Sequence, residues 1–231
     1  NFDDAHSGVK KIFSDKAYQE KLLEKGYRLS SANSINIGRL VPQIVYYVYA
    51  YCRLMKSGEL KAGESLNVSV PTGNFGNILA AYCAKRMGLP LGKLLCASND
   101  NKVLTDFFRT GIYDKNRPFH VTTSPSMDIL ISSNLERLLY FAGENAEECK
   151  KLMEELKDKG KYRISEAMEK ELKDFYSGYG KESEGSHSIF QTYKETGYVL
   201  DPHTAVAKVV ADHYAYEQGR RDKCLVVSTA S

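Results

Sequence analysis

One stretch of the chain, residues 65–88, restricts the possible folds more than any other. Apolar and polar residues alternate over residues 66–70, which is typical of a short β-strand. Pro71 cannot donate a hydrogen bond to a neighbouring strand, so the strand should end there. Apolar residues then recur on one helical face over residues 77–87, and Gly88 is expected to close that helix. The stretch therefore predicts a strand and a helix joined by a short loop.

The loop between them, residues 72–77, reads Thr-Gly-Asn-Phe-Gly-Asn. Its two glycines allow backbone N–H groups to converge, and the following helix contributes the positive end of its dipole. These are features of a phosphate-binding loop, although the loop matches neither a Walker A sequence nor the glycine pattern of dinucleotide folds. An ordinary strand-to-helix turn that uses glycine for its geometry is the alternative. The side chains of Thr72, Asn74 and Asn77 favour the phosphate site, because they add donors that a plain turn does not need.

Strands and helices alternate along much of the remaining chain. Further strands are expected at residues 93–97, at residues 119–123 and in a last segment that ends in Ser228-Thr229, with helices at residues 103–109 and 201–217. Such alternation is typical of βαβ units, and it predicts an α/β domain built on a parallel sheet. The strands are short and apolar, which indicates that both faces of the sheet are buried.

The middle of the chain, residues 127–176, has a different character. Helical patterns dominate, no strand is indicated, and residues 144–161 are heavily charged, as on a solvated helix face. Residues 178–185 are interpreted as a polar connector, and a short helix is expected at residues 189–196. We therefore divide the chain into an α/β portion, a mainly helical insertion and a return to the α/β domain, at residues 1–126, 127–184 and 185–231.

A tyrosine-rich helix is expected at residues 44–58. Its aromatic stripe is interpreted as core packing rather than as a base-stacking platform, since no basic residues interleave with it. The net charge of +3, with both signs interspersed, also argues against nucleic-acid binding. No apolar run reaches membrane-spanning length, and the five cysteines are scattered and never spaced as Cys-x-x-Cys. The composition is that of a cytoplasmic protein with reduced thiols and no metal site.

Both ends suggest a longer polypeptide. The chain starts at Asn1 without a methionine, and it stops just after an apolar strand whose free edge would normally be covered. We therefore expect the sequence to be an excerpt.

Two stretches together resemble one enzyme family. Residues 33–39, Asn-Ser-Ile-Asn-Ile-Gly-Arg, followed by residues 71–77, Pro-Thr-Gly-Asn-Phe-Gly-Asn, are similar to threonine synthase, a pyridoxal-phosphate (PLP) enzyme of the tryptophan-synthase-β type. Residues 1–4, 201–205 and 228–230 resemble the same family in the same order. The resemblance implies a three-layer αβα domain of PLP fold type II with a mostly helical insertion, and the insertion matches least specifically.

The resemblance implies a carbon–oxygen lyase of threonine biosynthesis, which converts O-phospho-L-homoserine and water into L-threonine and phosphate. Two phosphate sites would then lie close together, one for the cofactor and one for the substrate. The substrate phosphate would be held by Ser34, Arg39 and Asn74, because an arginine fork and a hydroxyl form strong bonds to phosphate oxygens. The cofactor contacts implied by the resemblance are Gly73, Asn74, Phe75, Gly76 and Asn77, with Thr229 at the pyridine nitrogen.

For individual residues, a purely structural role is the alternative to a role in binding the cofactor or the substrate. Arg39 could form a surface ion pair, and Thr229 or its neighbour Ser228 could cap the end of a strand. A hydroxyl at the pyridine nitrogen need not keep that nitrogen protonated, which would moderate the electron-sink character of the ring. His203 opens a helix, where the dipole disfavours its charged form. Packing or a hydrogen bond near the cofactor is therefore favoured over a role as general base.

In the family, the lysine that forms the Schiff base with PLP lies in a Ser- or Ala-Phe-Lys-Asp segment, and this chain contains no such segment. We therefore assign no catalytic residue here and expect the chain alone not to turn over substrate. Two other functions stay open: another PLP lyase, such as a threonine or serine dehydratase, and a non-catalytic module that binds phosphorylated metabolites. The expected partner is the small-molecule substrate, and the expected state is a monomer or a homodimer.

Overall fold

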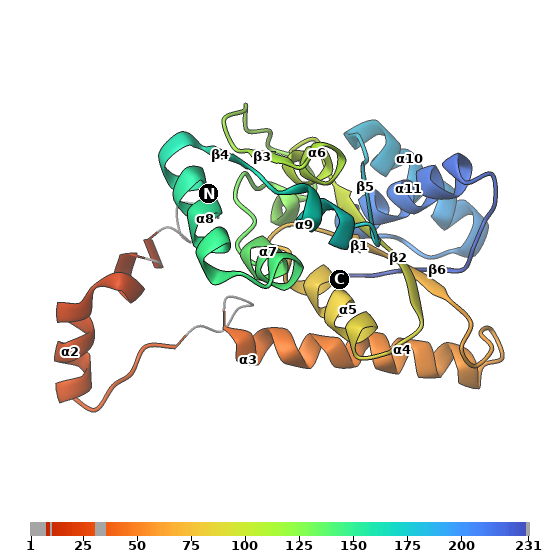
Figure 1. Ribbon diagram of the computed structural model, residues 1–231. Helices are drawn as coiled ribbons and strands as arrows, with labels where there is room; N and C mark the ends of the chain where they lie inside the picture. The colour runs from red at the N-terminus through yellow and green to blue at the C-terminus, as the bar shows by residue number, and fades with distance from the viewer. Residues whose placement is uncertain (1–7, 10, 31–35, 230–231) are drawn as a thin grey trace.

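A four-stranded parallel sheet lies at the centre of the computed structural model, which describes residues 8–9, 11–30 and 36–229. The strand order is β5-β2-β1-β6, and each neighbouring pair is parallel. Figure 1 shows these strands side by side with helices around them. The predicted α/β fold with a parallel sheet is confirmed. The strands are β1 (Leu66–Pro71), β2 (Leu91–Ser98), β5 (Phe175–Tyr179) and β6 (Cys224–Val226).

Fourteen further elements are assigned within the described ranges: ten helices, two 3-10 turns and two short strands. The helices are α2 (Lys16–Glu24), α3 (Ile37–Leu40), α4 (Ile44–Lys56), α5 (Gly76–Arg86), α6 (Val103–Thr110), α7 (Leu135–Gly143), α8 (Ala146–Lys159), α9 (Glu166–Glu171), α10 (Glu182–Thr196) and α11 (Pro202–Glu217), and one 3-10 turn is η2 (Pro125–Met127). A second 3-10 turn, η1 (Val41–Gln43), joins α3 to α4, and a small antiparallel pair consists of β3 (Ile112–Asp114) and β4 (Lys161–Arg163). Across the residues that the structure describes, no helix has the length and apolar character needed to cross a membrane.

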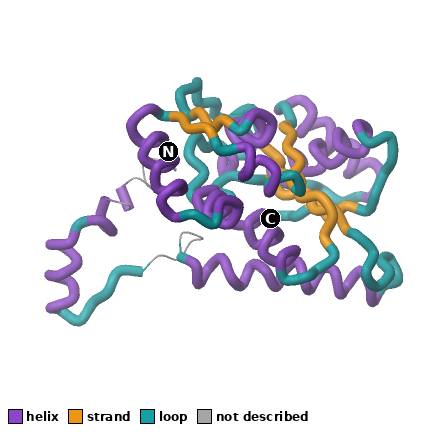
Figure 2. The backbone as a smooth tube through the Cα atoms, in the orientation of Figure 1, coloured by secondary structure: helices purple, strands orange, loops and turns teal. Residues whose placement is uncertain are grey.

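Helices cover both faces of the sheet, so the domain has three layers (Figure 2). Successive side chains of a strand point to opposite faces, and β2 follows this rule. Leu94 and Cys96 pack in one apolar core together with residues of α5 and α6, whereas Leu95 and Ala97 pack in a second core together with α11. Helix α10 packs against the outside of α11. Burial on both faces explains why these strands are apolar throughout.

The prediction of a strand at residues 119–123 is wrong. These residues run as a loop, because their backbone groups bond to side chains instead of a neighbouring strand. The His120 N–H donates to Asn101 Oδ1 at 2.9 Å, and the Thr122 N–H donates to Asp128 Oδ2 at 2.9 Å. Asn101, in the loop after β2, and Asp128, directly after η2, therefore hold this segment.

The place expected for that strand is taken by β5, which spans the end of the predicted helical region and the start of the predicted polar connector. β5 pairs with β2 from Leu94↔Phe175 to Ser98↔Tyr179. The prediction of a polar connector at residues 178–185 is also wrong, since β5 extends to Tyr179 and α10 begins at Glu182. Gly178 packs closely against α11, since a Cβ there would lie 3.0 Å from a methyl group of Val210, which is tighter than most contacts of a Cβ.

The helical middle of the chain consists of α7, α8 and α9 beside the β3–β4 pair. Helix α8 contains most of the charged run, and it buries only Cys149 and Leu152, as predicted for a solvated helix face. It begins at Asn145, whose side chain accepts from the N–H groups of Glu147 and Glu148. The domain boundaries at residues 126 and 184 stay a prediction, and β5 lies within the predicted insertion.

The tyrosine-rich helix is α4, but its aromatic stripe is only partly in the core. Tyr47 and Tyr51 are buried, whereas Val45, Tyr46 and Tyr49 are about 60% exposed, at 61%, 59% and 64%. In Figure 1 the helix lies along the lower side of the molecule, with α5 on one side of it. The predicted core packing is therefore correct for Tyr47 and Tyr51 and wrong for Val45, while Tyr46 and Tyr49 lie on the exposed face of α4.

Helix α11 begins at the predicted cap. The Asp201 carboxylate accepts from the N–H groups of His203 and Thr204, at 2.9 and 3.2 Å, and Pro202 follows as the first helical residue. Partial burial raises the pKa of Asp201, but hydrogen bonds from Thr204 and His203 outweigh that effect and hold the pKa below its ordinary value of 3.8.

Replacing the cap residue, Asp201→Ala, should lower the free energy of unfolding by about 0.5–2 kcal/mol. Because the pKa of this carboxyl is lower in the folded state, its stabilisation is present above about pH 3.8 and is lost as the pH falls through the folded-state pKa. Urea denaturation at several pH values measures both effects. Asp201→Asn should retain most of the stability, because asparagine caps equally well, and should lose this pH dependence. Equal stability of Asp201→Ala and the wild type would contradict the role of the cap.

Candidate anion-binding loop

The predicted loop lies at the carboxyl edge of the sheet, between the end of β1 and the start of α5. The Thr72 N–H still bonds to the Ala97 carbonyl of β2, at 2.9 Å, so the loop leaves the sheet after Thr72. Because β1, β2 and β6 are parallel, the segments that follow all three strands meet at this edge. In open α/β sheets, this is the edge at which ligands bind.

The backbone N–H groups of the loop are only partly engaged by the described residues. The N–H of Gly76 is capped by Asn74 Oδ1 at 3.1 Å. By contrast, the N–H groups of Asn74, Phe75 and Asn77 donate to no group within the described ranges. Phe75 has φ 68° and ψ 1°, a left-handed conformation that turns neighbouring amides toward the same side. Free amides at the start of an eleven-residue helix form a site suited to an anion.

Glycine at position 73 is required by close packing. A Cβ there would lie 2.2 Å from the backbone oxygen of Ser126, in the segment that contains η2. That distance is shorter than any real contact of a Cβ, so a side chain at position 73 would push the two segments apart. The loop therefore lies directly against residues 126–127.

Phe75 anchors the loop in the core. Its side chain is 1% exposed, and its ring centroid lies 6.0 Å from that of Phe108 and 5.9 Å from that of Phe175. A left-handed conformation costs a residue with a side chain about 1–2 kcal/mol. Burial of a phenylalanine ring is worth more than that cost. The aromatic core thus holds the backbone in the conformation that presents the amides.

Two residues of the segment before α7 donate hydrogen bonds to carbonyl groups of the loop. The Ser132 hydroxyl donates to the Gly73 carbonyl at 2.7 Å. The backbone N–H and the side-chain Nδ2 of Asn134 both donate to the Asn74 carbonyl, at 3.0 and 2.9 Å. Sequence reasoning missed both residues. The only available signal was the polar triplet Ser-Ser-Asn immediately before the helical pattern of residues 135–143.

Tyr47 holds the last residue of the loop. Its hydroxyl lies 3.1 Å from the Asn77 carbonyl and also bonds to Asn77 Oδ1. Burial raises the pKa of Tyr47 above its ordinary range, so the hydroxyl stays protonated and can donate. With Oδ1 engaged by Tyr47, the Nδ2 group of Asn77 is left to donate elsewhere.

His203 supports the loop indirectly. Its Nε2 accepts from the Ser126 N–H at 3.2 Å, and its Nδ1 lies 3.1 Å from Asp201 Oδ1. An accepting Nε2 requires that the proton be on Nδ1, where it bonds to the carboxylate. The imidazole thus holds the segment on which Gly73 packs. This arrangement agrees with the hydrogen-bonding role that we favoured over general-base catalysis.

The structure brings together only some of the predicted site residues. Gly73, Asn74, Phe75, Gly76 and Asn77 form the loop itself. Arg39 lies in α3, which contacts α5, and its guanidinium is exposed and bonds to no residue that the structure describes. Ser34 lies outside the described residues.

Thr229 follows β6 and is exposed. β6 pairs with β1 at Ser69↔Val226, so the same register, carried three residues further, brings Thr229 level with Thr72. Its role at the pyridine nitrogen stays a prediction. Ser228 is also exposed at this edge.

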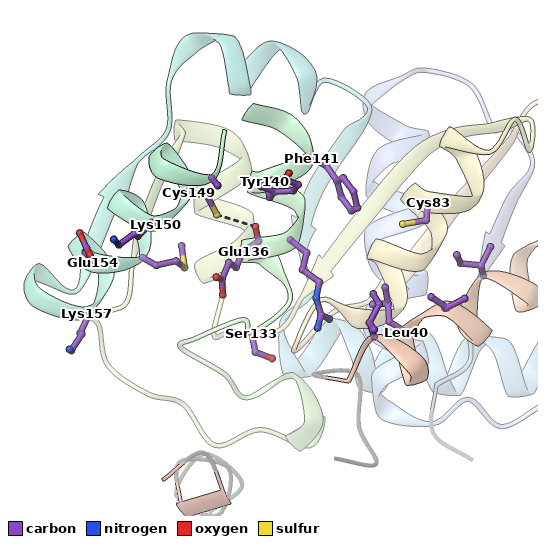
Figure 3. Close-up of a pocket in the computed structure, with 16 residues that line it drawn as sticks. Leu40, Cys83, Ser133, Glu136, Tyr140, Phe141, Cys149, Lys150, Glu154 and Lys157 are labelled. Atoms are coloured by element: carbon purple, nitrogen blue, oxygen red, sulfur yellow. Dashed lines mark hydrogen bonds between the residues drawn. The ribbon is translucent and has the colours of Figure 1, made fainter. Parts of the chain in front are cut away.

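A cavity of about 1000 Å³ lies among α3, α4, α5, α7 and α8 (Figure 3). It is lined by apolar side chains such as Leu40 and Phe141, and by the thiols of Cys83 and Cys149. Burial raises the pKa of both thiols, and Glu136 and Glu148 add to the effect at Cys149. These thiols are therefore not activated as nucleophiles. No residue of the loop lines this cavity.

Comparison with known proteins finds a consistent set of relatives. Threonine synthase-like 1 from Homo sapiens is 47% identical over 234 residues, which cover 100% of this chain and 31% of that protein. Threonine synthase from yeast superposes with a TM-score of 0.85 at 34% identity, covering 100% of this chain and 46% of that chain. PLP-bound threonine synthase from Brucella melitensis superposes with a TM-score of 0.83 at 39% identity, covering 99% of this chain and 47% of that chain. No protein-family model matches the chain. The chain spans about a third to a half of the length of these relatives.

Proposed function

We propose a function for this chain from the premise that it belongs to the threonine synthase family. The proposal is that the chain carries the phosphate-binding part of a PLP-dependent site. The reaction would be loss of phosphate from O-phospho-L-homoserine and addition of water to give L-threonine. The observation that carries the proposal is that the amides of Asn74, Phe75 and Asn77, at the start of α5, have no partner among the residues that the structure describes.

These residues fit the phosphate group of PLP. The loop offers the N–H groups of Asn74, Phe75 and Asn77 as donors, and Gly73 allows the backbone to approach neighbouring groups closely. Helix α5 adds its positive end, which stabilises a bound anion. We therefore assign the cofactor phosphate to the loop formed by Gly73, Asn74, Phe75, Gly76 and Asn77. When bound, PLP supplies an electron sink for the carbon that carries the substrate amine.

The remaining contact that we propose for the cofactor is Thr229. Its hydroxyl follows β6 at the same edge of the sheet as the loop. A hydroxyl can donate to a neutral pyridine nitrogen, or accept from a protonated one, so it does not fix the charge on the ring.

A second group of residues would hold the phosphate of the substrate. We propose Arg39 and Ser34 for this task, with the Nδ2 group of Asn74 as a third donor. The Arg39 guanidinium bonds to no residue that the structure describes, so it could bind a phosphate without breaking an existing ion pair there. Its fork of N–H groups matches two phosphate oxygens.

The experiment that tests this proposal is calorimetry of O-phospho-L-homoserine binding to the protein and to the variant Arg39→Ala. A charge-assisted bond contributes about 1.5–3 kcal/mol, so the affinity should fall roughly 10- to 100-fold. Arg53→Ala is the matched control, because Arg53 is also an exposed helical arginine, on α4. It should change the affinity less than about 2-fold, since exposed charges act weakly at a distance. Equal affinities for both variants would contradict the role of Arg39.

A second candidate is a module that binds phosphorylated metabolites without catalysis. It is favoured by the loop itself, whose backbone N–H groups can bind a phosphate without any catalytic residue. Phosphate release from O-phospho-L-homoserine has to be measured with PLP and the longer polypeptide from which we expect this sequence to come, since this chain alone is not expected to turn over substrate; only the enzyme releases phosphate there. A threonine or serine dehydratase would instead bind the unphosphorylated amino acid, and its affinity would not depend on Arg39.

A further inference from the structure

The two carbonyl groups at the back of the loop are held from outside it. Gly73 O accepts from the Ser132 hydroxyl, and Asn74 O accepts from both nitrogens of Asn134. Ser132 and Asn134 are 6% and 1% exposed, so water does not compete strongly for these bonds. All three bonds come from the short segment that leads into α7.

These bonds determine where the amides of the loop point. A peptide group is planar and trans, so the carbonyl of one residue and the N–H of the next point in opposite directions. Holding Gly73 O toward Ser132 therefore directs the Asn74 N–H away from that residue. Holding Asn74 O toward Asn134 directs the Phe75 N–H away in the same manner. Both donors consequently point to the open side of the loop.

We propose that Ser132 and Asn134 are positioning residues that give the loop its selectivity for an anion. If either peptide group rotated, it would present a carbonyl oxygen where a phosphate oxygen has to bind, and the two would repel each other. The bonds from Ser132 and Asn134 prevent that rotation. The inference rests on the proposed function, because it assumes that the loop binds phosphate.

Ser133 provides a matched control within the same segment. It lies between the two positioning residues, and its buried hydroxyl has no hydrogen-bond partner among the described residues. Ser133→Ala thus removes the same atom as Ser132→Ala without removing a bond to the loop. Ser132→Thr retains the hydroxyl and serves as the conservative variant.

The test is calorimetry with inorganic phosphate for the wild type, Ser132→Ala, Asn134→Ala, Ser132→Thr and Ser133→Ala. Each alanine variant at a positioning residue should bind phosphate about 2- to 10-fold more weakly. Ser133→Ala should stay within about 2-fold of the wild type, and Ser132→Thr should recover most of the affinity that Ser132→Ala loses. Melting temperatures are measured in parallel, and all titrations are made where every variant is folded.

The outcomes separate the two proposals. If Ser132→Ala and Asn134→Ala lower the melting temperature but bind phosphate as the wild type does, their role is structural and this inference is wrong. The proposed function would then still stand. If the wild type itself does not bind inorganic phosphate or PLP, both the inference and the proposed function are overturned.

Discussion

Replacing Gly73 by alanine should abolish phosphate binding by the loop and lower the free energy of unfolding by about 1–3 kcal/mol. The new Cβ would lie 2.2 Å from the backbone oxygen of Ser126. A backbone atom cannot rotate away as the end of a side chain can, so the loop or the segment around η2 has to move. Either movement disturbs the amides that follow Gly73. Calorimetry with inorganic phosphate and urea denaturation measure the two effects.

Gly185 provides the control for this prediction. It lies within α10, and a Cβ added there would meet no atom within 4 Å. Gly185→Ala should therefore stabilise the protein by about 0.5–1 kcal/mol, because alanine is the better helix former, and should leave phosphate binding unchanged. The two substitutions add the same methyl group and should have opposite effects on stability. Phosphate affinity in Gly73→Ala equal to that of the wild type would contradict the assignment of the loop.

Replacing Phe75 by alanine should lower the free energy of unfolding by about 3–5 kcal/mol. The ring is 1% exposed and packs against Phe108 and Phe175, so its removal leaves a cavity between α5, α6 and β5. The left-handed conformation at position 75 would remain unfavourable for alanine while the packing that offsets it is lost. The variant should thus lose phosphate affinity together with stability.

Phe190→Ala is the matched control, since it removes the same ring from a position that is 60% exposed. Its effect on stability should stay within about 0.5 kcal/mol. Urea denaturation of both variants tests the comparison. A loss of less than about 1 kcal/mol in Phe75→Ala would mean that the aromatic core does not hold the loop.

The loop and the strand and helix around it could be predicted from the sequence because their signals are local. Alternation in β1, proline at its end, and glycines before a helical pattern lie within about twenty residues of one another. The cap of α11 was also predictable, since Asp201 and Pro202 are adjacent in the sequence. In these cases the residues that form the structure are near each other along the chain.

The choice of the third strand could not be predicted in this way. Residues 119–123 have an apolar character similar to that of β5, but Asn101 and Asp128 hold their backbone with side-chain bonds. β5 is selected by packing, because its glycine lies against Val210 on a helix about thirty residues later. Sequence patterns do not contain such distant contacts.

The residues that hold the loop in place could not be predicted from the sequence for the same reason. Ser132 and Asn134 lie about sixty residues after the carbonyl groups that they bind. Tyr47 lies thirty residues before Asn77. Short polar residues before a helix are interpreted as helix caps. Only the fold shows that Ser132 and Asn134 also bind the carbonyl groups of Gly73 and Asn74.

The central claim is that backbone amides after β1 bind a phosphate group. A crystal structure of the protein grown with PLP tests it most directly. We predict phosphate oxygens at hydrogen-bond distance, about 2.7–3.2 Å, from the backbone nitrogens of Asn74 and Phe75. A phosphate group bound elsewhere, for example in the cavity beside Cys83 and Cys149, with these amides unoccupied, would contradict the account.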